Sequence, residues 1–179
     1  MGRELGIVVE KGPARRYRSV LTRADGVIVE LEGGAWNQVG GAAREVPHDL
    51  AHLVVEEELG LARGVWGVLA AGGLFRGARV VPGGRRQKAH AADRARAVLA
   101  ESVEELNQAE VLTRAVADLA LADRLDPGAA RRAAGERWWS EAVTRDALTR
   151  CFTRLRAEGE AWAALAPGET LARTYTPPR

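Results

Sequence analysis

The chain has 179 residues, 46% hydrophobic and 28% charged, which is typical of a folded globular domain and excludes an intrinsically disordered chain. Its 26 lysine and arginine residues nearly balance 24 aspartate and glutamate residues, so no excess of positive charge indicates a nucleic-acid partner. Cys151 is the only cysteine, which excludes an internal disulfide and favours a reducing, cytoplasmic location.

Residues 1–45 are expected to form an antiparallel meander of about three strands. Asp25-Gly26 is typical of a hairpin turn, because both residues tolerate positive φ. Hydrophobic and polar residues alternate in the third expected strand, which predicts one face toward a core and one toward solvent. The expected strands, rich in valine, isoleucine or tyrosine, span 5–10, 17–22 and 27–32.

Residues 46–162 show helical patterns. The first helix is expected from Pro47 to Leu59, because proline favours the first turn and Gly60 favours the end. A further apolar segment at 65–75 predicts a buried helix or turn, and it is too short to cross a membrane. Longer helical patterns cover 90–125, which a break at 126–128 ends, and 138–158.

Residues 163–179 are expected to contain a last strand, at 170–176, that can return to the N-terminal sheet. The three parts together predict one α+β domain, with a β-meander, a helical bundle and a C-terminal strand. The N-terminus lacks the basic and apolar layout of a secretory signal, so no membrane is expected as a partner.

Two histidines lie four residues apart in the first expected helix. On a helical projection with His48 at zero, His52, Glu56 and Asp49 fall at about 40°, 80° and 100°. Four ionisable side chains therefore share one side of this helix. Neutral imidazoles one turn apart can bind one metal ion, so His48 and His52 are predicted metal ligands and zinc is the expected cofactor. The alternative is that they only make hydrogen bonds within a packed helix.

A catalytic zinc site uses three protein ligands and leaves a fourth position for water. Glu56 lies about 12 Å along the helix axis from His48, which favours an orienting role over direct ligation. Asp49 and Glu56 are candidates for acid–base catalysis or for orienting the ligands. The third ligand stays open in the sequence, with the candidates Glu56, Glu45, His90, Glu101, Glu104 and Glu105.

The segment H-D-L-A-H at 48–52 resembles the zinc helix of zincin metallopeptidases, with Asp49 in the position of the catalytic glutamate. That resemblance implies that His48 and His52 bind zinc and that Asp49 is a general base. The segment is also similar to the HDxxH helix of the zinc proteins of ubiquinone biosynthesis, but Gly64 stands where those proteins have a further glutamate. The longer phrase V-P-H-D-L-A-H, with E-E-E-L-G and G-V-W-G, resembles an uncharacterised group of high-GC bacterial proteins, which implies no activity.

These features predict a cytoplasmic metalloprotein, either a zinc-dependent hydrolase or a lyase, that acts on a small molecule or a peptide. The alternative is a non-catalytic binding or assembly module, in which the histidine face is a polar patch in an interface or a homo-oligomer. Arg85 and Arg86, in a basic loop, and Trp66 are candidates for contacts with a substrate. Nucleic-acid binding through that loop is the least favoured hypothesis, because the overall charge is balanced.

Overall fold

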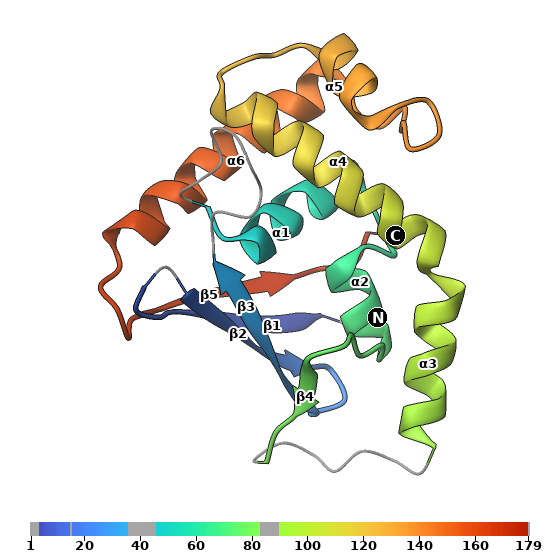
Figure 1. Cartoon of the computed structure of the whole chain (residues 1–179), viewed down its shortest axis with the longest axis vertical. Helices are drawn as coiled ribbons and strands as arrows, with labels where there is room; N and C mark the ends of the chain where they lie inside the picture. Colours follow the sequence, from blue (N-terminus) through green and yellow to red (C-terminus); the bar gives the residue numbers. More distant parts are fainter. Residues whose placement is uncertain (1–3, 15, 36–45, 83–89, 179) are drawn as a thin grey trace.

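A five-stranded antiparallel sheet and six helices make up the described part of the chain (Figure 1). The computed structural model describes residues 4–14, 16–35, 46–82 and 90–178. The strands are β1 (Leu5–Lys11), β2 (Arg16–Arg23), β3 (Ile28–Ala35), β4 (Ala78–Val80) and β5 (Thr170–Tyr175), in the order β4-β3-β2-β1-β5. The helices are α1 (His48–Leu59), α2 (Val65–Ala71), α3 (Ala91–Glu101), α4 (Val103–Leu121), α5 (Pro127–Ala134) and α6 (Arg145–Ala164).

The expected α+β fold with an N-terminal antiparallel meander is confirmed, and β5 does return to the sheet by pairing with β1. One face of the sheet forms part of the core. In β1, Ile7 and Val9 are buried and Val8 between them is exposed. The register pairs Ile7 with Leu21 and Val9 with Ser19, so alternate residues of β2 face the same core.

Helix α1 is the central helix, because it packs against α2, α4 and α6 and contacts β2 through Asp49 (Figure 1). It begins after Pro47 and ends at Gly60, whose φ of 68° is the left-handed conformation that glycine adopts easily. Asp49, His52 and Glu56 of this helix are all buried. Buried ionisable groups need polar partners, and those partners define the site described below.

Two parts of the 46–162 segment differ from the helical expectation. Strand β4 lies within it and pairs with β3, where Val29 is opposite Val80. The run at 90–125 is divided at Ser102 into α3 and α4. A strand of only three residues, and a break at a single serine, each leave a weak pattern in the local sequence. Neither can be recognised until the neighbouring elements are known.

The last two helices also begin differently from the expectation. Helix α4 ends already at Leu121, and the expected break at 126–128 is the start of α5, where the Asp126 side chain accepts the N–H of Ala129. The helix expected at 138–158 begins at Arg145 instead, because the Thr144 side chain accepts the N–H of Ala147. None of the described helices is both long enough and apolar enough to cross a membrane.

Candidate metal centre

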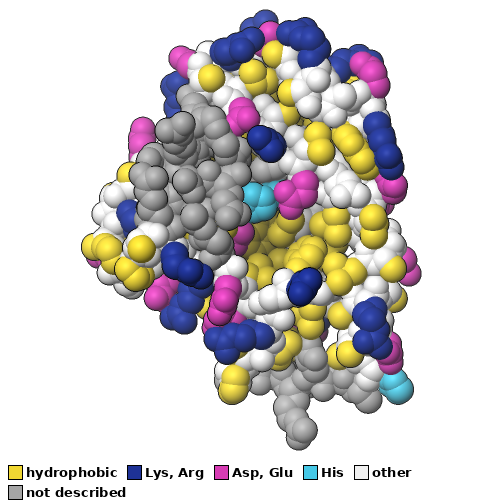
Figure 2. Space-filling view, in the orientation of Figure 1, with side chains coloured by type: hydrophobic (Ala, Val, Ile, Leu, Met, Phe, Trp, Pro, Cys, Tyr) yellow, Lys and Arg dark blue, Asp and Glu magenta, His cyan; other side chains and the backbone are white. Residues whose placement is uncertain are grey.

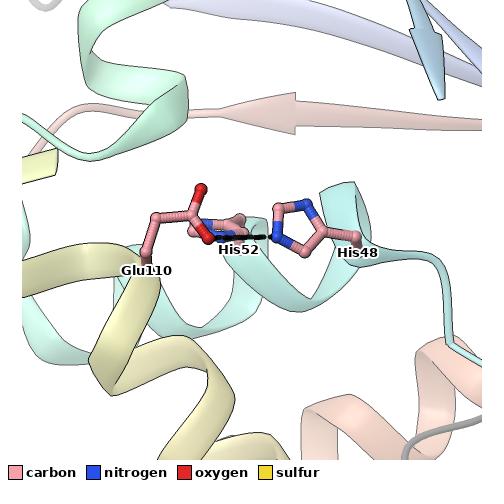
Figure 3. A group of neighbouring side chains, drawn as sticks. All are labelled: His48, His52 and Glu110. Atoms are coloured by element: carbon pink, nitrogen blue, oxygen red, sulfur yellow. Dashed lines mark hydrogen bonds and ion pairs between the residues drawn. The ribbon is translucent and has the colours of Figure 1, made fainter. Parts of the chain in front are cut away.

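His48, His52 and Glu110 bring three ligand atoms together between α1 and α4 (Figure 3). His48 Nε2 lies 3.2 Å from His52 Nε2 and 3.2 Å from Glu110 Oε2. His52 Nε2 lies 3.3 Å from the same carboxylate oxygen. The two imidazoles come from successive turns of α1 and the carboxylate comes from α4, so the packing of two helices forms a group close enough to hold a metal ion.

The size of this ligand triangle suits the coordination of one metal ion. Bonds of about 2.0–2.1 Å to zinc would place the ligand atoms of a tetrahedron about 3.3–3.4 Å apart. Neighbouring ligands of an octahedral ion with bonds of about 2.1 Å would be about 3.0 Å apart. The observed edges of 3.2, 3.2 and 3.3 Å lie between these two values, so one ion could contact all three atoms. Three ligands on one side of a tetrahedron leave its fourth position free.

Glu56 fixes the orientation of His52. Its Oε1 atom lies 3.0 Å from His52 Nδ1, so Nδ1 can donate its proton to this carboxylate and leave Nε2 to bind a metal ion. The backbone N–H groups of Val65 and Trp66, the first residues of α2, donate to the same carboxylate at 2.7 and 3.0 Å. In metal proteins, the ring nitrogen of a histidine that does not bind the metal often donates to a carboxylate, and this hydrogen bond orients the ligand.

The contact between Glu56 and α2 requires the glycine at position 64. A Cβ atom on Gly64 would lie 2.3 Å from Glu56 Cδ and 2.5 and 2.6 Å from its two oxygens, far inside van der Waals contact. The missing side chain therefore leaves the space that the Glu56 carboxylate occupies.

Asp49 connects His48 to the sheet. Its carboxylate accepts hydrogen bonds from Tyr17 Oη at 2.9 Å and from Ser19 Oγ at 2.6 Å, both on β2. Its Oδ1 atom also lies 3.7 Å from His48 Nδ1. Burial would raise the pKa of Asp49, but hydrogen bonds from His48, Ser19 and Tyr17 hold it below its usual range. Each histidine thus has a carboxylate at Nδ1 and presents Nε2 to the ligand triangle.

The charges of the group favour protonated histidines when no metal ion is bound. Burial disfavours the charged form of His48, but hydrogen bonds to Asp49 and Glu110 outweigh burial and raise its pKa to about 9. Burial also opposes the charged form of His52, whose pKa is nevertheless raised by Glu110 and Glu56. Burial would raise the pKa of Glu110, but hydrogen bonds from the two histidines lower it. The two histidines therefore hold their protons beside an ionised Glu110, and a metal ion has to displace protons from the imidazoles to bind.

The ligand triangle is open to solvent on one side. The His48 and Glu110 side chains are 31% and 51% exposed, whereas that of His52 is fully buried. Figure 2 shows a histidine beside an acidic side chain at the surface between α1 and α4, next to a hollow lined by hydrophobic side chains. Solvent therefore reaches two of the three side chains of the group.

The structure brings the two predicted histidines together and adds a third candidate ligand, which the sequence candidates did not include. Glu110 takes that position. Glu56 hydrogen-bonds behind His52, and Glu45 lies outside the described residues. The other candidates are exposed and do not belong to the group: His90, Glu101, Glu104 and Glu105. The local sequence around Glu110 does not identify it as a candidate ligand. Only the packing of α4 against α1 does so.

Of the three residues expected to contact a substrate, two lie outside the described part of the chain and one is buried in the core. Arg85 and Arg86 fall outside the described residues. Trp66 is fully buried, and its indole N–H donates to the backbone carbonyl of Asp49 at 3.0 Å. Its indole therefore supports α1 from within the core.

Comparisons with known proteins found no matching family model, no matching curated protein and no matching solved structure. The chemistry of the site is therefore the basis for a functional conclusion. Two imidazoles and one carboxylate, in a group partly exposed to solvent, form a ligand set that suits metal-assisted chemistry.

Proposed function

We propose that the chain is a metal-dependent hydrolase whose ion, zinc, is held by His48, His52 and Glu110. The observation that carries this proposal is the triangle of ligand atoms with edges of 3.2–3.3 Å, open to solvent on one side. Two histidines and one carboxylate with a free fourth position are a ligand set of catalytic zinc sites in hydrolases. Zinc in such a site lowers the pKa of its water to about 7 and polarises a carbonyl oxygen.

Two further carboxylates orient the ligands in this proposal. Asp49 and Glu56 lie at the Nδ1 atoms of the imidazoles, away from the Nε2 atoms that face the ion. Asp49 stands where the metallopeptidase helix has its general base, but its oxygens accept hydrogen bonds from Tyr17 and Ser19. This contact with the sheet favours an orienting role for Asp49 over proton exchange with a substrate.

The ligand types favour zinc over magnesium and calcium. Magnesium and calcium prefer oxygen ligands, and this group offers two nitrogen atoms and one oxygen. Ferrous iron also binds two histidines and one carboxylate, but with further positions open in an octahedral arrangement. The ligand types therefore support zinc, and ferrous iron is the ion to compare with it in metal-binding experiments.

Hydrolysis of a chromogenic ester by chelator-treated protein, before and after addition of one equivalent of zinc, tests the proposal. We expect activity that depends on zinc and is lost in Glu110→Gln. His90→Ala is the matched control, because His90 has an 87% exposed side chain and does not belong to the ligand group. Equal activity with and without zinc, or in wild type and Glu110→Gln, would contradict the proposal.

A further inference from the structure

Thr113 is a buried polar residue on the side of α4 that packs against α1. Its neighbours within about 60° around the helix include Ala109, Val116 and Ala117, which are all fully buried. Thr113 itself is only 1% exposed. A hydroxyl buried among apolar side chains costs free energy unless it has a hydrogen-bond partner. The partner of this hydroxyl therefore indicates what the threonine does.

The hydroxyl of Thr113 contacts His52. Its Oγ1 atom lies 3.4 Å from His52 Nδ1, the same nitrogen that lies 3.0 Å from Glu56 Oε1. Two threonines of α6 behave differently, because the hydroxyls of Thr149 and Thr153 donate to the backbone carbonyl four residues earlier in their own helix. The Thr113 hydroxyl thus reaches across to another helix, to the ring that carries one of the three ligand atoms.

Helix α4 contacts both ring nitrogens of His52. Glu110 Oε2 lies 3.3 Å from Nε2, and Thr113 Oγ1 lies 3.4 Å from Nδ1. Figure 3 shows the Glu110 carboxylate reaching from α4 toward the histidines of α1. Glu110 and Thr113 are three residues apart, which is about 4.5 Å along the helix axis. The packing that brings the candidate ligand to one ring nitrogen therefore also brings the hydroxyl to the other.

We propose that Thr113 is a positioning residue, whose hydroxyl fixes the rotation of the His52 ring so that Nε2 faces His48 and Glu110. This inference rests on the proposed metal-dependent function and adds a residue that acts on the metal through His52. Valine has nearly the same shape as threonine, so packing alone does not require a hydroxyl at this position. Glu56 on α1 and Thr113 on α4 hold the ring from two helices, which restricts its rotation more than either contact alone.

Thr113→Val and Thr113→Ser separate the hydroxyl from the packing, because valine keeps the shape and serine keeps the hydroxyl. We expect the zinc dissociation constant, measured by chelator competition, to rise about tenfold in Thr113→Val and to stay unchanged in Thr113→Ser. The visible absorption spectrum of the cobalt-loaded protein should change in the valine variant alone. Thr153→Val is the matched control, because the Thr153 hydroxyl contacts only its own helix within the described part of the chain.

A purely structural role predicts the reverse order of the two variants. The serine variant loses a buried methyl group, so its metal-free form should unfold at a lower urea concentration than the valine variant. Stoichiometric zinc with wild-type affinity in Thr113→Val, or an equal loss of affinity in Thr113→Ser or Thr153→Val, overturns the positioning role and leaves the metal site standing.

The contact can also be tested in protein that does not retain zinc, an outcome in which the proposed function fails. The probe is then the ¹⁵N chemical shift of His52 Nδ1 in NMR spectra of the metal-free protein. A shift that changes in Thr113→Val and is restored in Thr113→Ser supports the positioning of the ring by Thr113. No change in either variant, or the same change in both, overturns it.

Discussion

His52 Nδ1 and Glu56 Oε1 lie 3.0 Å apart on successive turns of α1, and both side chains are fully buried. When Nδ1 of the neutral imidazole donates its proton to this carboxylate, a lone pair is left on His52 Nε2, which lies 3.2 Å from His48 Nε2. The backbone of α2 holds the carboxylate and so also fixes the direction of that lone pair. The geometry of the site thus depends on residues that orient the histidines, as well as on the histidines and Glu110.

Replacing Glu56 with glutamine should weaken metal binding. One oxygen becomes an amide group, so one of the N–H donors that now reach Glu56 loses its acceptor. We expect the zinc dissociation constant to rise about 10- to 100-fold and the free energy of unfolding to fall by about 1–3 kcal/mol. Competition with a chromophoric chelator and urea unfolding measure the two effects.

Glu58→Gln is the control for that variant. Glu58 lies on the same helix, but it pairs with Arg150 and Arg154 and not with a histidine. Its substitution should leave zinc affinity unchanged. An equal loss of zinc affinity in the two variants would argue against the orienting role of Glu56.

Gly64→Ala should displace the Glu56 carboxylate from its position beside α2. The added methyl group would lie 2.3 Å from Glu56 Cδ, so Glu56 or α2 has to move. We expect a loss of about 1–3 kcal/mol in unfolding free energy, together with weaker zinc binding. Gly60→Ala separates the two effects, because Gly60 has positive φ but free space around it. That variant should lose about 1 kcal/mol of stability and keep its zinc affinity. Unchanged zinc affinity in Gly64→Ala would contradict the role given to this glycine.

Zinc affinity should increase with pH. The pKa of His48 in the metal-free protein is raised from 6.5 to about 9, so its proton stabilises the fold below about pH 6.5, and this stabilisation is lost as the pH rises through about 9. Zinc has to displace that proton. We expect the association constant to rise by up to about tenfold per pH unit between pH 6.5 and 9 for one displaced proton. Chelator competition at several pH values measures it, and a constant affinity over this range would contradict the shifted pKa.

Tyr17→Phe should destabilise the protein without removing the metal. Asp49 is buried and would lose one of its two hydrogen bonds to β2, which costs about 1–3 kcal/mol of unfolding free energy. Tyr175→Phe is the matched control, because the buried Tyr175 hydroxyl has no hydrogen-bond partner within the described part of the chain. Urea unfolding compares the two variants. Equal effects would show that the hydroxyl of Tyr17 does not support Asp49.

Local sequence signals predicted much of the fold and two of the three residues in the candidate ligand group. The alternation of the N-terminal strands and the proline and glycine around α1 act over a few residues, so they can be read without tertiary structure. His48 and His52 are one helical turn apart, which alone places them on one side of α1.

The third ligand depends on a contact that no local pattern encodes. Glu110 lies 62 residues beyond His48, and its helix carries Glu104 and Glu105 in equally helical surroundings. Only the packing of α4 against α1 selects Glu110 among them. The position of Glu56 against Gly64 likewise depends on how the chain turns between α1 and α2.

Metal analysis of the purified protein tests the central claim most directly. After incubation with zinc and removal of free ions, elemental analysis gives the zinc content of wild type and of His52→Ala, Glu110→Gln and His90→Ala. We expect one zinc ion per chain in wild type and in His90→Ala, and loss of zinc in the two ligand variants. Wild type without stoichiometric zinc, or equal zinc content in all four proteins, would contradict a metal site at His48, His52 and Glu110.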